Sequence, residues 1–181
     1  MSTLSVDTIQ GKTTAGTIAM PSGSVVQTII NSPDTAAATH DVTSWTEVSS
    51  GMRTSITPKF TNSILFIQFN LLVGCNNGTT MRHWKIGDYT NTTDVDLGHS
   101  AESNRTNMHA SARHRDHDAN DADVMTITAQ EVSGDLNARS YTLYCKNETG
   151  HSSALYHHHT TTDSAAIGYI KPMIIIQEIK Q

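Results

Sequence analysis

The chain has 181 residues, of which 36% are hydrophobic and only 16% are charged, and its net charge is −5 with the histidines neutral. This length suits one domain with appendages, and the charged share lies below the usual value of about 25%. No cluster of Lys and Arg forms a basic face and no apolar run approaches the ~18 residues of a membrane span, so we expect no nucleic-acid binding and no membrane insertion.

The first 23 residues predict an extended arm rather than a folded unit. Glycines at positions 11, 16 and 23 and a proline at position 21 interrupt it, and it buries too little apolar surface to offset the entropy of ordering it. We therefore expect the arm to become ordered by docking onto another protein. It lacks the basic start and apolar run of a secretory signal peptide, which predicts synthesis without one. The expected docking contacts are Leu4, Val6, Ile9, Ile18 and Met20.

Residues 24–181 predict an all-β domain. Abundant Thr favours strands over helices. Short apolar or alternating runs are separated by turn signals, and eight to ten such runs favour an antiparallel β-sandwich of jelly-roll-like type. We expect the polar ranges 87–123 and 147–165 to be variable loops. The expected strands cover 25–30, 45–48, 52–56, 64–73, 81–86, 124–129, 141–145, 155–159 and 167–179, with a further one near 107–115.

The range 64–73 is the strongest strand prediction. Its odd positions are all apolar, as at Leu65 and Ile67, so they form the face toward the core. The even positions mix apolar and polar residues, which suits an outer face partly covered by another chain. The dipeptide Asn77-Gly78 follows, and it predicts a hairpin to the next strand.

The last expected strand is apolar on both faces. Pro172 lies within it, which predicts a bulge, a bend or an edge position. A strand of this kind has to be covered twice, by the chain's own second sheet and by a neighbouring subunit. We therefore predict a subunit interface formed by Phe66, Ile174, Ile175 and Ile176.

Both ends of the chain resemble a known family. The segments STLSVDTIQ (2–10) and GTIAMPSGSVVQ (16–27) resemble the leader of small tail-fibre-like virion proteins of bacteriophages, above all those of aquatic bacterial hosts. The β-sandwich that follows in that family is similar to TEV (46–48), MRTSITP (52–58), NSIL (62–65) and IIIQEI (174–179). The resemblance implies a homotrimer whose arm docks onto other virion proteins. It also implies that distal loops contact a host-surface glycan or protein.

The resemblance implies a structural protein of the virion, in a tail fibre or a comparable appendage, made in the host cytoplasm. The alternative is a capsid decoration protein that clips onto the phage head and stabilises it, since both types combine a docking arm with a compact β domain. We do not expect an enzyme, because the sequence has no G-x-S-x-G, no H-E-x-x-H and no glycine-rich phosphate loop.

Histidine is abundant, and one cluster has the spacing of a metal site. His157 and His159 fall on one face of an expected strand, because side chains alternate along a strand. Near a three-fold axis, three chains would offer six imidazoles to one transition-metal ion such as iron, nickel or zinc. The alternative is a solvated histidine loop with no cofactor. The acidic run 116–121 lacks the Gly and Glu of an EF-hand, which leaves a solvated loop or a looser calcium site from Asp116, Asp118 and Asp123.

Five aromatic residues have two interpretations. They could form an exposed platform on which a sugar ring stacks, or they could pack in the core and across strands. Their strand-like spacing favours packing. The five are Trp84, Tyr89, Tyr141, Tyr144 and Tyr156.

Overall fold

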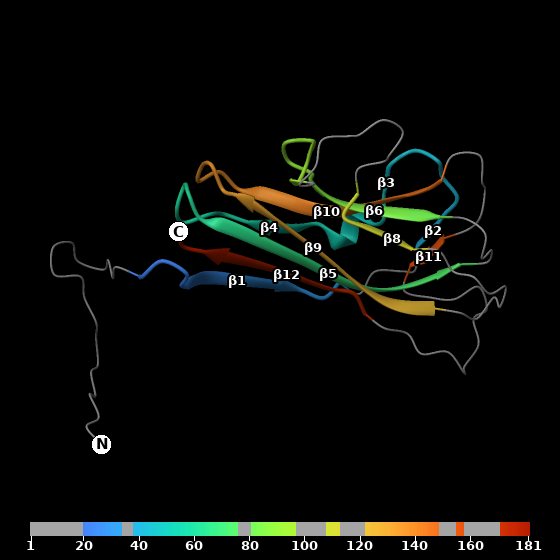
Figure 1. Cartoon of the computed structure of the whole chain (residues 1–181), viewed down its shortest axis with the longest axis horizontal. Coiled ribbons are helices and arrows are strands. Elements are labelled where there is room, and N and C mark those ends of the chain that lie inside the picture. Colours follow the sequence, from blue (N-terminus) through green and yellow to red (C-terminus); the bar gives the residue numbers. More distant parts are fainter. Residues whose placement is uncertain are drawn as a thin grey trace, which may run out of the picture.

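The computed structural model describes residues 20–33, 38–75, 81–96, 108–112, 122–148, 155–157 and 171–181. In these ranges the chain is all-β, as the composition predicts. Two antiparallel sheets lie face to face, and the helical element among the described residues is the short 3-10 turn η1 (Ser50–Met52) (Figure 1). No helix in this part of the chain is long and apolar enough to cross a bilayer.

The first sheet, sheet A, is built around β5 (Ile64–Cys75). Its neighbour β12 (Met173–Ile179) pairs with one edge of β5, and β1 (Val25–Asn31) pairs with β12. On the other edge, β9 (Ala122–Val132) pairs along nearly the whole of β5. Two short strands extend the sheet past the end of β12. The strand β11 (Leu155–His157) pairs with the end of β5, and β2 (Ala38–His40) pairs with β11.

The second sheet, sheet B, is built around β10 (Arg139–Asn147). One edge of β10 pairs with β6 (Arg82–Asp88), and the other edge pairs with β3 (Thr46–Glu47) and β4 (Thr54–Ile56). The far edge of β6 carries two short strands, β7 (Thr93–Asp94) and β8 (Ala110–Ala112). Both lie in the range 87–123, which was expected to be mainly loop: β8 confirms the strand expected near 107–115, whereas β7 was not expected.

The core lies between the two sheets, where alternate residues of each strand point inward. Leu65, Ile67 and Phe69 on β5 are fully buried, which confirms the predicted core face. Trp84 and Tyr141 from sheet B pack in the same cluster. Each large apolar side chain buried in this way contributes about 1.5–3 kcal/mol. The other members are Val48, Met52, Ile56, Leu71, Val73, Ile86, Val95, Ile127, Leu143, Cys145, Ile174 and Ile176.

The hairpin predicted at Asn77-Gly78 is wrong. The strands β5 and β6 belong to different sheets, so the chain continues in sheet B rather than folding back beside β5. The physical reason is that neither edge of β5 is free at this point. At Val73 and Gly74, β9 occupies one edge and β11 the other.

Pro172 precedes β12 instead of interrupting it. Its ring therefore removes no donor from the strand ladder, and its carbonyl oxygen accepts a hydrogen bond from Ser32 Oγ at 3.0 Å. The earlier part of that expected strand, 167–170, lies outside the described residues.

The chain enters sheet A beside its own C-terminus (Figure 1). The N–H of Gly23 donates to the Lys180 carbonyl oxygen at 2.7 Å, and the N–H of Lys180 donates to the Ser24 carbonyl oxygen at 3.0 Å. The Lys180 ammonium group donates to the carbonyl oxygen of Met20 at 2.5 Å. Gly23 has φ of +83°, a conformation in which glycine is favoured. Residues 20–24 are thereby joined to the end of β12.

Candidate functional site

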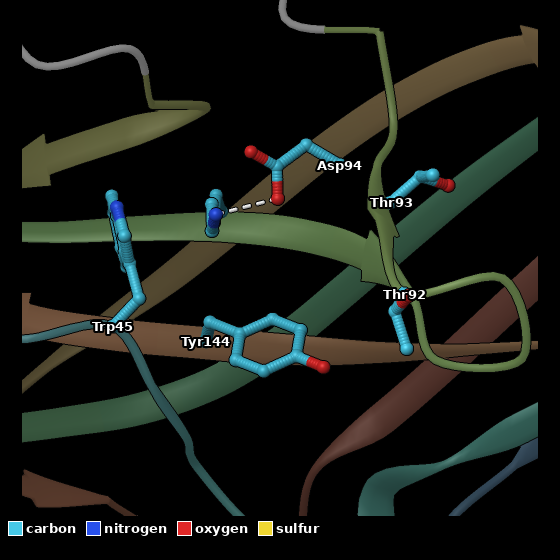
Figure 2. Close-up of a pocket in the computed structure, with 6 residues that line it drawn as sticks. Trp45, Thr92, Thr93, Asp94 and Tyr144 are labelled. Atoms are coloured by element: carbon cyan, nitrogen blue, oxygen red, sulfur yellow. Dashed lines mark ion pairs between the residues drawn. The ribbon is translucent and has the colours of Figure 1, made fainter.

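A shallow groove lies on the outer face of sheet B, the face turned away from the core (Figure 2). Its volume is about 190 Å³, below the ~300–1,000 Å³ of pockets that enclose a drug-sized ligand. The groove therefore suits one small ring rather than an enclosed molecule. The groove residues are Trp45, Lys85, Thr92, Thr93, Asp94 and Tyr144.

Strand alternation places Tyr144 at the floor of the groove. Its neighbours Leu143 and Cys145 on β10 are buried in the core, so Tyr144 points outward. Its ring lies against the backbone of Gly87 on β6, where an added Cβ atom would sit 2.7 Å from Tyr144 Cε2. The absence of a side chain at Gly87 is what allows the ring to approach the sheet this closely.

Trp45 forms one side of the groove. It precedes β3, whose Thr46 pairs with Cys145. The Nζ atom of Lys85 lies 4.9 Å from the centroid of the Trp45 ring, and Nζ of Lys146 lies 5.2 Å from it. Both distances are within the ~6 Å range of cation–π attraction. The chain's own ammonium groups therefore already occupy positions around the indole.

Lys85 also pairs with Asp94, and its Nζ lies 2.5 Å from Asp94 Oδ1 (dashed line in Figure 2). The two residues share the outer face because Asp94 on β7 pairs with Gly87 on β6. The Lys85 side chain is 13% exposed and that of Asp94 is 43% exposed, so the carboxylate is accessible to a ligand. An ion pair this exposed contributes about 0–1 kcal/mol to the stability of the fold. Its main effect is to fix the positions of the Lys85 ammonium group and the Asp94 carboxylate relative to each other.

Asp88 fixes the turn between β6 and β7. Its Oδ1 accepts hydrogen bonds from the N–H groups of Thr90 at 2.9 Å and Asn91 at 3.2 Å, and its Oδ2 accepts from the Asn91 side-chain amide at 2.6 Å. Thr92 follows with φ of +56°, a conformation that β-branched residues rarely adopt. The turn thus holds a strained residue at the rim of the groove, and backbone strain of this kind clusters at binding sites.

An ion pair beside the groove stabilises the strand that follows Trp45. Arg53 Nε and Nη2 donate to Oε1 and Oε2 of Glu47 at 2.8 and 2.6 Å, and the Thr142 hydroxyl donates to Oε1 at 2.8 Å. The hydrogen bonds from Arg53 lower the pKa of the Glu47 carboxyl against the opposing effect of burial. The Arg53 guanidinium also lies 3.5 Å from the centroid of the Tyr89 ring.

The groove residues offer binding groups of several kinds: two aromatic rings, a carboxylate, an ammonium group and hydroxyls. Burial raises the pKa of the Tyr144 phenol, and the nearby Glu47 carboxylate adds to the shift. The phenol therefore stays protonated at neutral pH and can donate a hydrogen bond to a ligand. Among the residues that the structure describes, no group of three or more His, Cys, Asp and Glu side chains is placed to hold a metal ion.

The outer face of sheet A is a second candidate surface. At the outward positions of β1, β5, β9 and β12, every residue is either apolar or polar without a charge. The side chains of Ile30, Val124 and Val132 are 65%, 66% and 59% exposed. This charge-free face consists of Val25, Thr28, Ile30, Ile64, Phe66, Gln68, Asn70, Val124, Thr126, Thr128, Gln130, Val132, Met173, Ile175, Gln177 and Ile179.

The four residues predicted to form a subunit interface lie on opposite sides of sheet A. Phe66 and Ile175 belong to the charge-free face and are partly exposed. Ile174 and Ile176 point into the core and have no exposed surface, which corrects the prediction for these two. Their cover is sheet B of the same chain, so a neighbouring subunit has no access to them.

The arm and the histidine cluster fall mainly outside the described residues. Met20 is half-buried beside Lys180, whereas Leu4, Val6, Ile9 and Ile18 lie outside the described ranges. His157 is described only through the backbone of β11, and His159 lies outside the described residues. Of the acidic residues considered for calcium, Asp123 is exposed on β9, and Asp116 and Asp118 lie outside the described part.

The five aromatic residues considered above separate into two groups. Trp84 and Tyr141 are core residues with no exposed surface, whereas Tyr89 and Tyr144 lie on the outer face of sheet B. Tyr156 is described only through the backbone of β11. Trp45 begins the expected strand 45–48 but was not among the aromatic residues considered for sugar binding. Comparison of the chain with protein-family models and with curated proteins finds no match.

Proposed function

We propose that the chain is a structural protein of a bacteriophage virion, in a tail fibre or a comparable appendage, and that it forms a jelly-roll-like homotrimer. Residues 1–23 dock it onto other virion proteins, and its remaining surface attaches to a host-surface glycan or protein. The biological setting comes from the resemblance of the leader to phage proteins. The structural observation that carries the proposal is the charge-free face of sheet A.

The charge-free face supports contact with further copies of the same chain. Each copy carries a net charge of −5, so two copies repel each other overall as they approach. A surface without charges avoids that repulsion. Exposed aliphatic side chains such as Ile30 and Val132 add about 25 cal/mol for each Å² of apolar area removed from water. Contact through apolar and uncharged groups is typical of homo-oligomers.

The size of the charge-free face indicates that it is one part of a larger interface. Each of its strands contributes a length like that of β12, which has 7 residues. Four strands spaced about 4.8 Å apart, with a rise of about 3.4 Å per residue, cover roughly 450 Å² in projection. A stable interface buries about 800 Å² on each partner. The assembly therefore needs further contacts between the β domains in addition to this face.

Purified virions that encode this chain provide the test. We expect mass spectrometry to detect the chain in the particle, and densitometry to give a copy number that is a small multiple of three. Hundreds of copies per particle would identify a capsid decoration protein instead. Absence from the virion would overturn the proposal.

A truncated chain tests the role of the arm separately. Without residues 1–23 the protein should keep its oligomeric state but should no longer enter particles. Normal incorporation would show that the anchor lies in the β domain.

A further inference from the structure

We propose that the groove on sheet B binds an uncharged sugar ring. Tyr144 and Trp45 provide the surfaces on which the ring stacks, and the Asp94 carboxylate accepts hydrogen bonds from the sugar hydroxyls. This inference takes its biological setting from the proposed function and names the ligand class through which the virion attaches. It differs from the sequence-based expectation, because the binding site lies on the outer face of a sheet rather than on distal loops.

The two aromatic rings supply the apolar contact that a pyranose needs. One side of a sugar ring presents C–H groups, which pack on the face of an aromatic ring. The ring of Tyr144 is held against the backbone at Gly87, so little conformational entropy is lost when a ligand covers it. Figure 2 shows Tyr144 between Trp45 and Thr92, with Asp94 across the groove from it.

The polar groups match the hydroxyls of a sugar. The Asp94 carboxylate is 43% exposed even though Lys85 contacts its Oδ1, and a carboxylate accepts strong hydrogen bonds from hydroxyl groups. Lys85 has three N–H donors, of which Asp94 engages one, and the Tyr144 phenol adds another donor. Acceptors and donors therefore lie on the same small surface, which is the combination that vicinal hydroxyls require.

The charges of the groove argue against ionic ligands. Each carboxylate on this face already has a cationic partner, since Asp94 pairs with Lys85 and Glu47 pairs with Arg53. The carboxylate of an acidic sugar would also approach the Asp94 carboxylate, which is 43% exposed, and the two would repel each other. A quaternary ammonium ligand is excluded for a different reason, because Lys85 already occupies the cation position 4.9 Å from the indole and 5.8 Å from the Tyr144 ring.

The small volume predicts weak binding by a single site. A hollow of about 190 Å³ that is open to solvent holds one ring, and a ligand of this size at ordinary efficiency binds with a Kd on the order of 1 mM. Several copies in one assembly would raise the overall avidity by a factor of about 10²–10⁴. Weak individual sites in a multimeric appendage are therefore consistent with firm attachment.

Intrinsic fluorescence of the full chain tests the proposal, because the two tryptophans differ in accessibility. Trp84 is fully buried and Trp45 is partly exposed in the groove, so quenching by acrylamide reports on Trp45. We would titrate a panel of methyl hexopyranosides to about 100 mM, roughly 100 times the expected Kd. A saturable change in Trp45 emission, with protection from acrylamide, is expected for at least one of them. No response to any of the panel overturns the proposal, as does stronger binding of glucuronate or choline.

Matched variants show whether the groove itself is responsible. Tyr144→Ala and Asp94→Asn should each weaken binding about tenfold or more, whereas Phe60→Ala and Asp123→Asn remove the same kinds of group elsewhere and should not. Far-UV circular dichroism verifies that each variant is folded. Equal affinity in Tyr144→Ala and the wild type would overturn the assignment. The titration works on any oligomeric state, so failure here leaves the virion test unaffected, and the reverse also holds.

Discussion

Glu178 and Ser63 are separated by 115 residues in the sequence, yet Ser63 Oγ donates a hydrogen bond to Glu178 Oε1 at 2.7 Å inside the protein. Glu178 has no exposed surface. It also accepts from the backbone N–H of Lys59 at 2.8 Å, from the backbone N–H of Phe60 at 2.9 Å and from the Gln27 side-chain amide at 2.7 Å. One buried carboxylate thus joins β1, β12 and the turn that leads into β5.

Removing this carboxylate should destabilise the whole domain. We expect Glu178→Ala to lower the free energy of unfolding by about 3 kcal/mol, because each buried donor that loses its acceptor costs about 1–3 kcal/mol and some of them regain water. Glu178→Gln keeps the shape and one acceptor oxygen, so its cost should be about 1–2 kcal/mol. Urea denaturation measures both values. Wild-type stability in Glu178→Ala would show that these hydrogen bonds make no net contribution.

Acid should destabilise the protein in two steps, and the first involves the histidines. Burial lowers the pKa of His40, His83 and His109 from the ordinary value of 6.5. Below pH 6.5 these histidines therefore bind protons in the unfolded chain but remain neutral in the folded chain. As a result, the free energy of unfolding falls as the pH drops toward 5. Thermal denaturation between pH 7.5 and 5 should show a falling Tm, and a constant Tm would contradict the prediction.

His109 offers a specific control for that step. Its Nδ1 accepts a hydrogen bond from the N–H of Ile86 at 3.0 Å, and protonation of Nδ1 removes this acceptor. In His109→Gln the side-chain oxygen can accept the same bond at every pH. The variant should therefore show a shallower loss of Tm between pH 7 and 5 than the wild type.

The second acid step involves Glu178. Burial alone would raise the pKa of its carboxyl, but hydrogen bonds from Ser63, Gln27 and the backbone at Lys59 and Phe60 together lower it below the ordinary 4.5. A depressed carboxyl pKa stabilises the folded state above pH 4.5, and this contribution is lost as the pH falls through the folded-state value. The wild type should lose stability in this range, whereas Glu178→Gln, which has no proton to bind, should lose less.

Gly87→Ala should disturb the groove more than the fold. The new Cβ would sit 2.7 Å from Tyr144 Cε2 and 3.3 Å from the Thr93 carbonyl oxygen, so the ring has to move away from the sheet. We expect a loss of about 1–3 kcal/mol in stability, as is usual for overpacking, together with weaker sugar binding. In the double variant Gly87→Ala/Tyr144→Ala the clash partner is absent, so most of the stability should return. Equal stability of the single and double variants would show that the ring is not the obstacle.

A charge on the charge-free face should break the proposed oligomer. Ile30 is 65% exposed on β1, and Leu136 is 52% exposed in the turn between β9 and β10. We expect Ile30→Glu to shift the mass measured by light scattering from trimer to monomer, because burying an unpaired carboxylate costs several kcal/mol. Leu136→Glu introduces the same group away from this face and should leave the trimer intact. A trimer in Ile30→Glu would place the interface elsewhere.

The strand content and the core side of β5 could be predicted from the sequence because they depend on local alternation. Leu65, Ile67 and Phe69 repeat with a period of two, and the structure buries all of them. The Asn77-Gly78 signal failed because a turn dipeptide carries no information about which edges of β5 are already occupied. Those edges are filled by β9 and β11, whose sequences lie far along the chain.

The two candidate surfaces could not be predicted because they depend on pairing register. Tyr141 and Tyr144 lie three residues apart on β10 and therefore face opposite sides of the sheet. Trp45 reaches the groove through pairing of β3 with a strand about 100 residues away in sequence. Similarly, the absence of charged residues from the outer face of sheet A is recognised only when β1, β12, β5 and β9 are aligned side by side.

The contact of residues 23 and 24 with Lys180 has a mechanical consequence. The chain enters β1 at the end of the sheet where β12 finishes, so a pull on Met20 directed along the axis of β1 is borne first by these two strands. The backbone hydrogen bonds between β1 and β12 are then loaded together in shear, rather than opened one after another as in a peeled strand. A domain tethered through Met20 would therefore resist a pulling force with all the backbone hydrogen bonds between β1 and β12 at once.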